Sequence, residues 1–182
     1  MLKIFSAFRG ENNGSAMVYA LLEHVILTEL GVKLPHIAKT PNGKPYFPCQ
    51  PDIHFSLSHT KTHVLCAISD SPVGVDIESP RQISERAVNF FCSPEELEYF
   101  TPLELWVLKE SYIKLKGGTL PMVKSIRFTR DCGNIVSPDN SVLCGLYFTE
   151  NNTAAVATTS VSIPESYELI TISLDHYFQS SD

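Results

Sequence analysis

The segments VGVDIE at Val73–Glu78 and LWVLKESYIK at Leu105–Lys114 decide the fold of this chain. In the first segment, large apolar side chains occupy every second position, as they do along a strand with one face in the core. In the second, apolar residues recur at helical spacing around most of the circumference, which indicates a central helix. A buried strand therefore precedes a buried helix near the middle of the chain.

Turn and cap residues place the other elements around this pair. Residues 15–30 are rich in apolar side chains and end at Gly31, a natural C-cap, so we expect a helix there. Ser93 and Thr101 are each followed by Pro and then, at the third position, by Glu, which predicts two further helix starts. We predict strands at residues 2–8, 53–58, 63–69, 122–130, 142–148, 153–159 and 167–174, and a long loop at 35–52.

This order of elements predicts an α+β protein. Residues 1–79 and 80–182 each combine a helix with antiparallel strands, so we expect two similar α/β halves in one compact unit. The chain has 182 residues, of which 43% are apolar, so it is long enough for a sizeable core and a disordered chain is excluded.

Charge and targeting signals narrow the function. The net charge of −6 argues against nucleic-acid binding, and the absence of a long apolar run predicts a cytoplasmic protein that contacts no membrane. The five cysteines form no C-x-x-C pair, so we expect small buried residues in a reducing compartment. Residues 109–130 hold six basic residues and one acidic residue, which suits an anionic ligand or an acidic partner, although a solvated face gives the same pattern.

Two groups of side chains are candidates for chemistry. Asp76 and Glu78 share one face of their strand, where hard oxygen ligands at this spacing suit Mg²⁺; a solvent-facing pair at a strand end is the alternative. Glu110 and Lys114 share the narrow polar side of the helix, where they are either site residues or a surface ion pair. Lys109 falls toward the apolar side of that helix, so its ammonium group either extends to solvent or reaches an anion.

Other motifs are weaker. His54, His59, His63 and Cys66 do not have the spacing of a structural zinc site. The segment Pro41–Pro45 contains Gly and Lys but does not match a phosphate-binding G-x-x-x-x-G-K-[ST] loop.

Five segments, taken in order, resemble the Sfp-type 4′-phosphopantetheinyl transferases. They are Gly43-Lys44-Pro45 with Pro48, His54-Phe55-Ser56-Leu57-Ser58-His59, Val73–Glu78, Phe90-Phe91-Cys92-Ser93 with Glu96, and Leu105–Lys114. The resemblance covers about residues 42–120. It implies a fold of two similar α+β halves with the active site in the cleft between them.

The resemblance also implies a reaction and its residues. Enzymes of this type transfer 4′-phosphopantetheine from coenzyme A to a serine of an acyl or peptidyl carrier protein, with Mg²⁺, and release 3′,5′-ADP. The expected partners are thus coenzyme A and a carrier protein, and the expected state is a monomer. The implied roles are metal binding by Asp76, Glu78 and Glu110, catalysis by Glu110 as base and Lys114 at the departing phosphate, and coenzyme A binding by Gly43, Lys44, Pro45, Ser58, His59 and Lys109.

The N-terminal region departs from the family pattern. Family members carry basic residues before the first helix, whereas Glu11–Ser15 reads ENNGS and Arg9 is the nearby cation. Either coenzyme A binds more weakly, or Lys61 or Lys109 compensates. Two other functions remain open from the sequence: a different Mg²⁺-dependent phosphoryl enzyme that uses the same carboxylates, and a carrier-binding module without catalytic activity.

Overall fold

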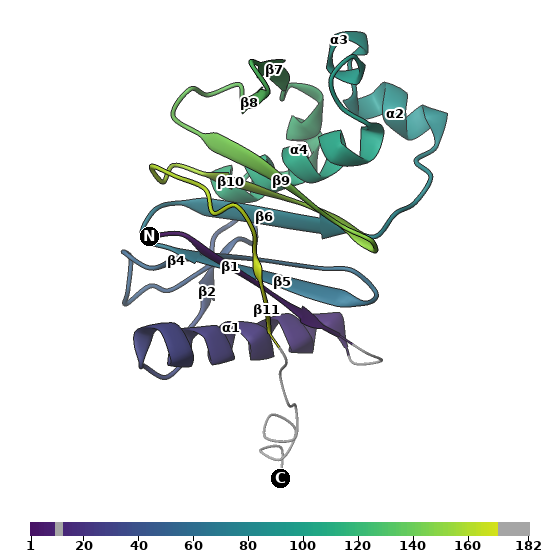
Figure 1. The fold of residues 1–182 in the computed structure, drawn as a ribbon. Coiled ribbons are helices and arrows are strands. Elements are labelled where there is room, and N and C mark those ends of the chain that lie inside the picture. The colour runs from purple at the N-terminus through teal and green to yellow at the C-terminus, as the bar shows by residue number, and fades with distance from the viewer. Residues whose placement is uncertain (10–12, 171–182) are drawn as a thin grey trace.

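The computed structural model describes residues 1–9 and 13–170 and arranges them in four layers (Figure 1). Helix α1 covers a four-stranded sheet, a three-stranded sheet lies on the other face of that sheet, and helix α4 covers the three-stranded sheet. The helices are α1 (Gly14–Leu30), α2 (Glu85–Phe91), α3 (Pro94–Leu97), α4 (Pro102–Lys116) and the 3₁₀ helix η1 (Leu120–Lys124). The strands are β1 (Lys3–Phe8), β2 (Ala38–Lys39), β3 (Pro45–Tyr46), β4 (His54–His59), β5 (His63–Ser69), β6 (Val73–Glu78), β7 (Thr129–Asp131), β8 (Asn134–Val136), β9 (Leu143–Thr149), β10 (Asn152–Thr158) and β11 (Glu168–Ile170).

Each of the two main sheets combines strands from both sides of residue 79. The four-stranded sheet has the order β11-β1-β5-β4, and the three-stranded sheet has the order β6-β10-β9. All of their pairs are antiparallel except β1 with β11, where Phe5 lies beside Glu168. Each sheet thus contains one strand that comes from the sequence of the other half. The fold is mixed α+β, as the sequence predicts.

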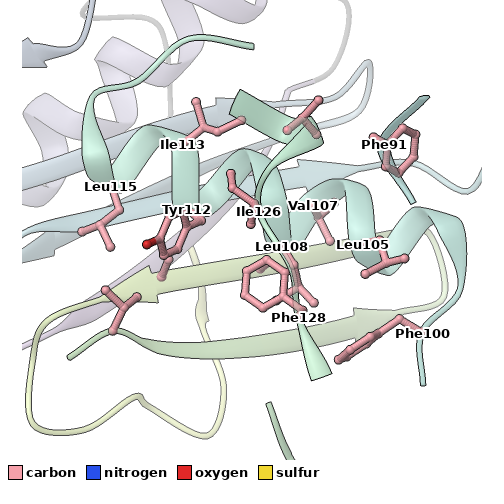
Figure 2. Close-up of a cluster of buried hydrophobic side chains, with 14 residues drawn as sticks. Phe91, Phe100, Leu105, Val107, Leu108, Tyr112, Ile113, Leu115, Ile126 and Phe128 are labelled. Carbon is pink, nitrogen blue, oxygen red and sulfur yellow. The ribbon is translucent and has the colours of Figure 1, made fainter. Parts of the chain in front are cut away.

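Hydrophobic side chains fill the spaces between the layers. One cluster joins α1 to the four-stranded sheet, and a second joins the two sheets through Val73, Val75 and Ile77 of β6. A third lies between α4 and the three-stranded sheet and includes Phe128, whose ring meets that of Tyr112 edge-on (Figure 2). Both faces of β6 are therefore covered.

Serine side chains connect the two sheets where β4 and β6 run side by side. The backbone N–H of Val75 donates to Ser56 Oγ at 3.0 Å, and that of Ile77 donates to Ser58 Oγ at 3.3 Å. These bonds satisfy backbone donors on the outer edge of β6 that no neighbouring strand pairs.

The cap residues predicted the starts of helices α3 and α4 correctly. Ser93 and Thr101 each form a capping box with the Glu three residues later, and Gly31 and Gly117 end α1 and α4 in the left-handed conformation. The predicted strand at 122–130 is wrong: η1 begins this stretch and β7 ends it. Buried Val123 and Ile126 are three residues apart, so burial in this stretch does not alternate as it would along a strand.

Smaller differences concern the loops and the cysteines. The hairpin β2–β3 lies within the predicted loop 35–52, and helix α2 and strand β8 were not predicted. Of the predicted strand 167–174, β11 forms residues 168–170, and the rest lies outside the described residues. All five cysteines are free thiols. Cys66 is buried and Cys92 and Cys144 are partly buried, but Cys49 and Cys132 are exposed, so the prediction of burial fails for the last two. In the described part of the chain, no helix is both long enough and apolar enough to cross a membrane.

Candidate functional site

Strand β6 and helix α4 approach each other closely at Gly74. A Cβ at this position would lie 2.0 Å from the carbonyl oxygen of Ser111 and 2.4 Å from the backbone nitrogen of Leu115, so no larger residue fits. This contact lies on the strand face that also carries Asp76, two residues further on. The carboxylate of Asp76 therefore faces α4, and the predicted solvent-facing alternative is wrong, since Asp76 is buried.

Asp76 holds two donors through a single oxygen. Its Oδ1 accepts from Ser58 Oγ at 2.8 Å and from Lys114 Nζ at 2.7 Å. Its Oδ2 is buried and has no hydrogen-bond partner. A buried carboxylate oxygen without a donor is unfavourable unless a further group completes the site.

Glu110 supplies a second oxygen of this kind. The side chain lies one helical turn before Lys114, and its Oε1 is buried without a hydrogen-bond partner. Burial raises the pKa of the Glu110 carboxyl, the charges of Asp76 and Glu78 raise it further, and the charge of Lys114 opposes them. Like charges that face one another in a partly dehydrated place are typical of a cation-binding or catalytic site.

Glu78 is held differently from the other two carboxylates. Its Oε1 accepts from Trp106 Nε1 at 3.0 Å and from the guanidinium group of Arg81 at 3.3 Å. Trp106 was not predicted as a partner of the site, because it belongs to the apolar repeat of α4.

A cavity of about 550 Å³ lies beside these groups. Glu110 and Lys114 line it from α4, Gly43, Lys44 and Pro45 from the β2–β3 hairpin, and Ser15, Val18 and Tyr19 from α1. Its size is within the range of small-molecule and cofactor sites. The structure thus brings together five of the residues that the sequence analysis selected.

The β2–β3 hairpin is attached to the C-terminal end of α4. Lys44 Nζ donates to the carbonyl oxygen of Leu115 at 2.8 Å, and Asn42 Nδ2 donates to that of Gly117 at 2.9 Å. Burial lowers the pKa of the Lys44 ammonium group. Gly43 has a φ of 87°, which suits the tight turn between β2 and β3. Lys44 therefore shapes the cavity wall and supports a carbonyl-rich helix end.

His59 lies in a different hollow from the cavity. This second space, of about 520 Å³, is lined by His59, Arg9, Lys61, Glu78 and Arg81, among others. The His59 ring packs against the start of α1, where a Cβ on Gly14 would lie 2.9 Å from its Nδ1. Ser58 is buried on Asp76 and lines neither space. Lys61 lines the same space as His59.

The predicted role of Lys109 in coenzyme A binding is wrong. Lys109 is fully buried, and its Nζ donates to Glu96 Oε2 at 2.8 Å and to the carbonyl oxygen of Phe91. The ammonium group has reached an anion, as its place on the apolar side of α4 allowed, but that anion is a protein carboxylate. It therefore cannot compensate for the few cations at the N-terminus.

The site fits a divalent cation in part. Within residues 1–9 and 13–170, no three His, Cys, Asp or Glu side chains converge as a ready-made metal site. Asp76 Oδ2 and Glu110 Oε1 are nevertheless two hard, unpaired oxygens of the type that Mg²⁺ prefers, and Mg²⁺ takes its remaining ligands from water and phosphate. Glu78, which Trp106 and Arg81 hold, is the carboxylate of the expected three that fits least well.

Comparison with known proteins agrees with this geometry. The family model of the 4′-phosphopantetheinyl transferase superfamily matches residues 72–167, slightly more than half of the chain. The chain belongs to this superfamily. The matched region begins directly before β6 and contains Asp76, Glu78, Glu110 and Lys114.

Individual relatives support the assignment. The chain is 38% identical over 118 residues to the 4′-phosphopantetheinyl transferase Sfp of Bacillus subtilis strain 168, covering 56% of this chain and 52% of that protein. It is 38% identical over 89 residues to the 4′-phosphopantetheinyl transferase gsp of Aneurinibacillus migulanus, covering 43% and 37%. It is 33% identical over 111 residues to psf-1 of Bacillus pumilus, covering 53% and 47%. The chain spans about half the length, or less, of these curated relatives.

Proposed function

We propose that this superfamily member transfers 4′-phosphopantetheine from coenzyme A to a serine of an acyl or peptidyl carrier protein. The observation that carries the proposal is the pair of unpaired carboxylate oxygens on Asp76 and Glu110, close to the ammonium group of Lys114 beside a cofactor-sized cavity. This arrangement combines a place for a cation, a base and a group that neutralises phosphate. The names of the relatives, which are phosphopantetheinyl transferases, support the same reaction.

Coenzyme A would extend from the cavity beside Glu110 to the second space, which His59 lines. The hairpin Gly43–Pro45 forms a wall for the adenine, and His59 and Lys61 offer donors and positive charge for the 3′-phosphate. Ser58 would act through Asp76, which it orients by a hydrogen bond, because its own side chain is buried.

The chain's own side chains supply the proton and charge transfers. As the serine oxygen forms a bond to the phosphorus next to pantetheine, Glu110 takes the hydroxyl proton, directly or through a water molecule. The bond from that phosphorus to the bridging oxygen breaks, and 3′,5′-ADP leaves with the electron pair. Lys114 donates to the departing phosphate, and its bond to Asp76 holds it at this place.

Mg²⁺ is the metal that these oxygens suit. Asp76 and Glu110 would hold it, with Glu78 as the expected third carboxylate. When bound, the ion would neutralise charge on the pyrophosphate of coenzyme A.

Mass spectrometry of a carrier protein tests the proposal. A purified apo carrier is incubated with the protein, coenzyme A and Mg²⁺, and the expected result is a mass increase of one phosphopantetheine group. A carrier with its acceptor Ser replaced by Ala is the control and should gain nothing. Phosphate release without a carrier would indicate a different phosphoryl enzyme. Carrier binding without a mass change would indicate a non-catalytic module.

A further inference from the structure

The buried ion pair of Glu96 and Lys109 joins four parts of the C-terminal half. Glu96 Oε2 accepts from Lys109 Nζ at 2.8 Å and from the backbone N–H of Ser93 at 2.9 Å. Glu96 Oε1 accepts from the backbone N–H of Phe128 at 3.0 Å, and Lys109 also donates to the carbonyl oxygen of Phe91. The pair thus connects α4 with the end of α2, with α3 and with the segment before β7.

Burying such a pair costs desolvation free energy, so it is an inefficient way to stabilise a core. Both side chains are at most 1% exposed, so both charges have lost nearly all contact with water. Apolar side chains of similar size give comparable or greater stability at buried positions, so stability alone does not explain the pair. An ion pair differs from apolar packing because its hydrogen bonds are directional. Its bonds to fixed backbone groups can form in only one relative orientation of the elements that it joins.

Glu110, the next residue on α4, is the side chain whose orientation must be fixed. Glu110 follows Lys109, so any rotation of α4 about its axis moves both side chains together. The unpaired Oε1 of Glu110 and the nearby charge of Asp76 favour a rotation that would carry Glu110 toward water. Contact at Gly74 fixes how closely α4 approaches β6, but it does not by itself fix the rotation.

We propose that Glu96 and Lys109 are positioning residues of the transferase site: their ion pair fixes the rotation of α4 and so keeps the carboxylate of Glu110 beside Asp76. This inference rests on the proposed function for its kinetic consequence. Its structural consequence stands independently, because it concerns the setting of a helix in the free protein.

Trp106 offers a direct measurement of that setting. It is the single tryptophan of the sequence, it lies on α4, and its indole N–H donates to Glu78 Oε1 on β6. A ¹H–¹⁵N spectrum therefore contains one indole resonance, whose hydrogen-exchange rate reports whether α4 keeps its bond to β6, whereas its position also responds to the Phe91 ring, whose centre lies 5.2 Å from that of the indole.

The test uses the neutral double variant Glu96→Gln/Lys109→Met. Single variants would leave one buried charge unpaired and could fail to fold, whereas the double variant leaves none. The control is Lys3→Met/Glu29→Gln, the same pair of substitutions at a partly exposed ion pair between β1 and α1, away from the site. Thermal unfolding is measured for both, and kinetics are compared well below the lower melting temperature.

We expect the Glu96→Gln/Lys109→Met variant to shift the indole resonance and to speed its exchange at least tenfold. The kcat for transfer should fall by at least tenfold, with the KM for coenzyme A within twofold of wild type, while the control changes neither. An indole resonance at the wild-type position with the wild-type exchange rate would overturn the proposal, even if the melting temperature falls. If the wild type transfers nothing, the proposed function fails, and the indole measurement still decides the role of the pair.

Discussion

The ammonium group of Lys114 on α4 lies 2.7 Å from Oδ1 of Asp76 on β6. This bond connects the central helix to the strand that the sequence places first in the site, and Ser58 reinforces it from β4. Because Ser58 and Lys114 both use Oδ1, Oδ2 remains available to a further positive group. A cation and a lysine can therefore act on the same carboxylate at the same time.

Replacing Asp76 should stop the reaction. In Asp76→Ala, Lys114 loses its counter-ion and a hard oxygen ligand disappears, so we expect kcat/KM for transfer to fall by roughly 10²–10³ or more at any practical Mg²⁺ concentration. Glu78→Ala should be milder, by about tenfold, because Glu78 is already engaged by Trp106 and Arg81. Near-wild-type turnover of Asp76→Ala in the carrier assay would remove Asp76 from the site.

Glu110 should make the protein less stable at neutral pH. Burial raises the pKa of its carboxyl in the folded state, so the folded protein binds this proton more tightly than the unfolded chain. The stability from this group is then fully present below the ordinary pKa of about 4.3 and is lost as the pH rises through the raised folded value. Glu110→Gln should therefore melt at a higher temperature than wild type at pH 7, by roughly 2–4 °C per kcal/mol regained.

Calorimetry between pH 4 and pH 8, without divalent metal, checks this expectation. The difference between Glu110→Gln and wild type should shrink as the pH falls toward 4, because both side chains are then neutral. A difference that stays constant over this range would contradict it.

His59 should distinguish coenzyme A from dephospho-coenzyme A. A charge-assisted hydrogen bond to the 3′-phosphate is worth roughly 1.5–3 kcal/mol, or about one to two decades in affinity. Calorimetric titration should show that the wild type binds dephospho-coenzyme A more weakly and that His59→Ala removes most of the difference. An unchanged ratio in the variant would make His59 a packing residue against the start of α1.

Two lysines should contribute to carrier binding. Lys116 is paired with Asp139 at 2.6 Å, whereas Lys124 lies 4.2 Å from the centre of the half-exposed Phe90 ring. We expect Lys116→Glu/Lys124→Glu to raise the KM for an acidic carrier several-fold, with most of the effect from Lys124, and to leave the KM for coenzyme A unchanged. The effect should weaken with salt, since exposed charges are screened beyond about 10 Å at 0.1 M.

The control for this charge reversal is Lys33→Glu/Lys39→Glu, which changes the net charge equally at exposed positions in the N-terminal half. Equal KM values for the carrier in the two double variants would mean that only overall charge matters. A carrier KM that neither variant changes would indicate docking through apolar contacts.

Gly74→Ala should be among the most damaging substitutions in the chain. The new methyl group would overlap backbone atoms of α4, which cannot move without shifting Glu110 and Lys114. We expect a loss of about 3 kcal/mol or more in the free energy of unfolding, measured by urea titration. The nearby Val75→Ala, which creates a cavity instead of a clash, is the comparison, and its transfer activity at low temperature should survive better.

The sequence predicted the parts of the fold and site that local rules control. The helix starts at Ser93 and Thr101 depend on residues within one turn, and the shared face of Asp76 and Glu78 depends on strand alternation. These signals do not require knowledge of what packs on them.

Contacts between distant residues explain the failures. Nothing near Lys109 in the sequence announces Glu96 as its partner, because the two side chains meet only after α3 folds back on α4. The 3₁₀ turn of η1 likewise depends on burial of Val123 under α4, which a local pattern of apolar residues does not encode. Trp106 reads as an ordinary core residue until β6 places Glu78 beside its indole nitrogen.

The parallel pairing of β1 with β11 has a consequence for synthesis of the chain on the ribosome. Phe5 pairs with Glu168, so one edge of β1 stays without backbone partners until residue 168 has been synthesised. Contacts between residues so far apart in the sequence form slowly, because the chain loses loop-closure entropy before the contact forms. During this interval β1 is an open edge that other nascent chains can pair with, so the yield of folded protein should depend on chaperones that bind extended segments near the N-terminus.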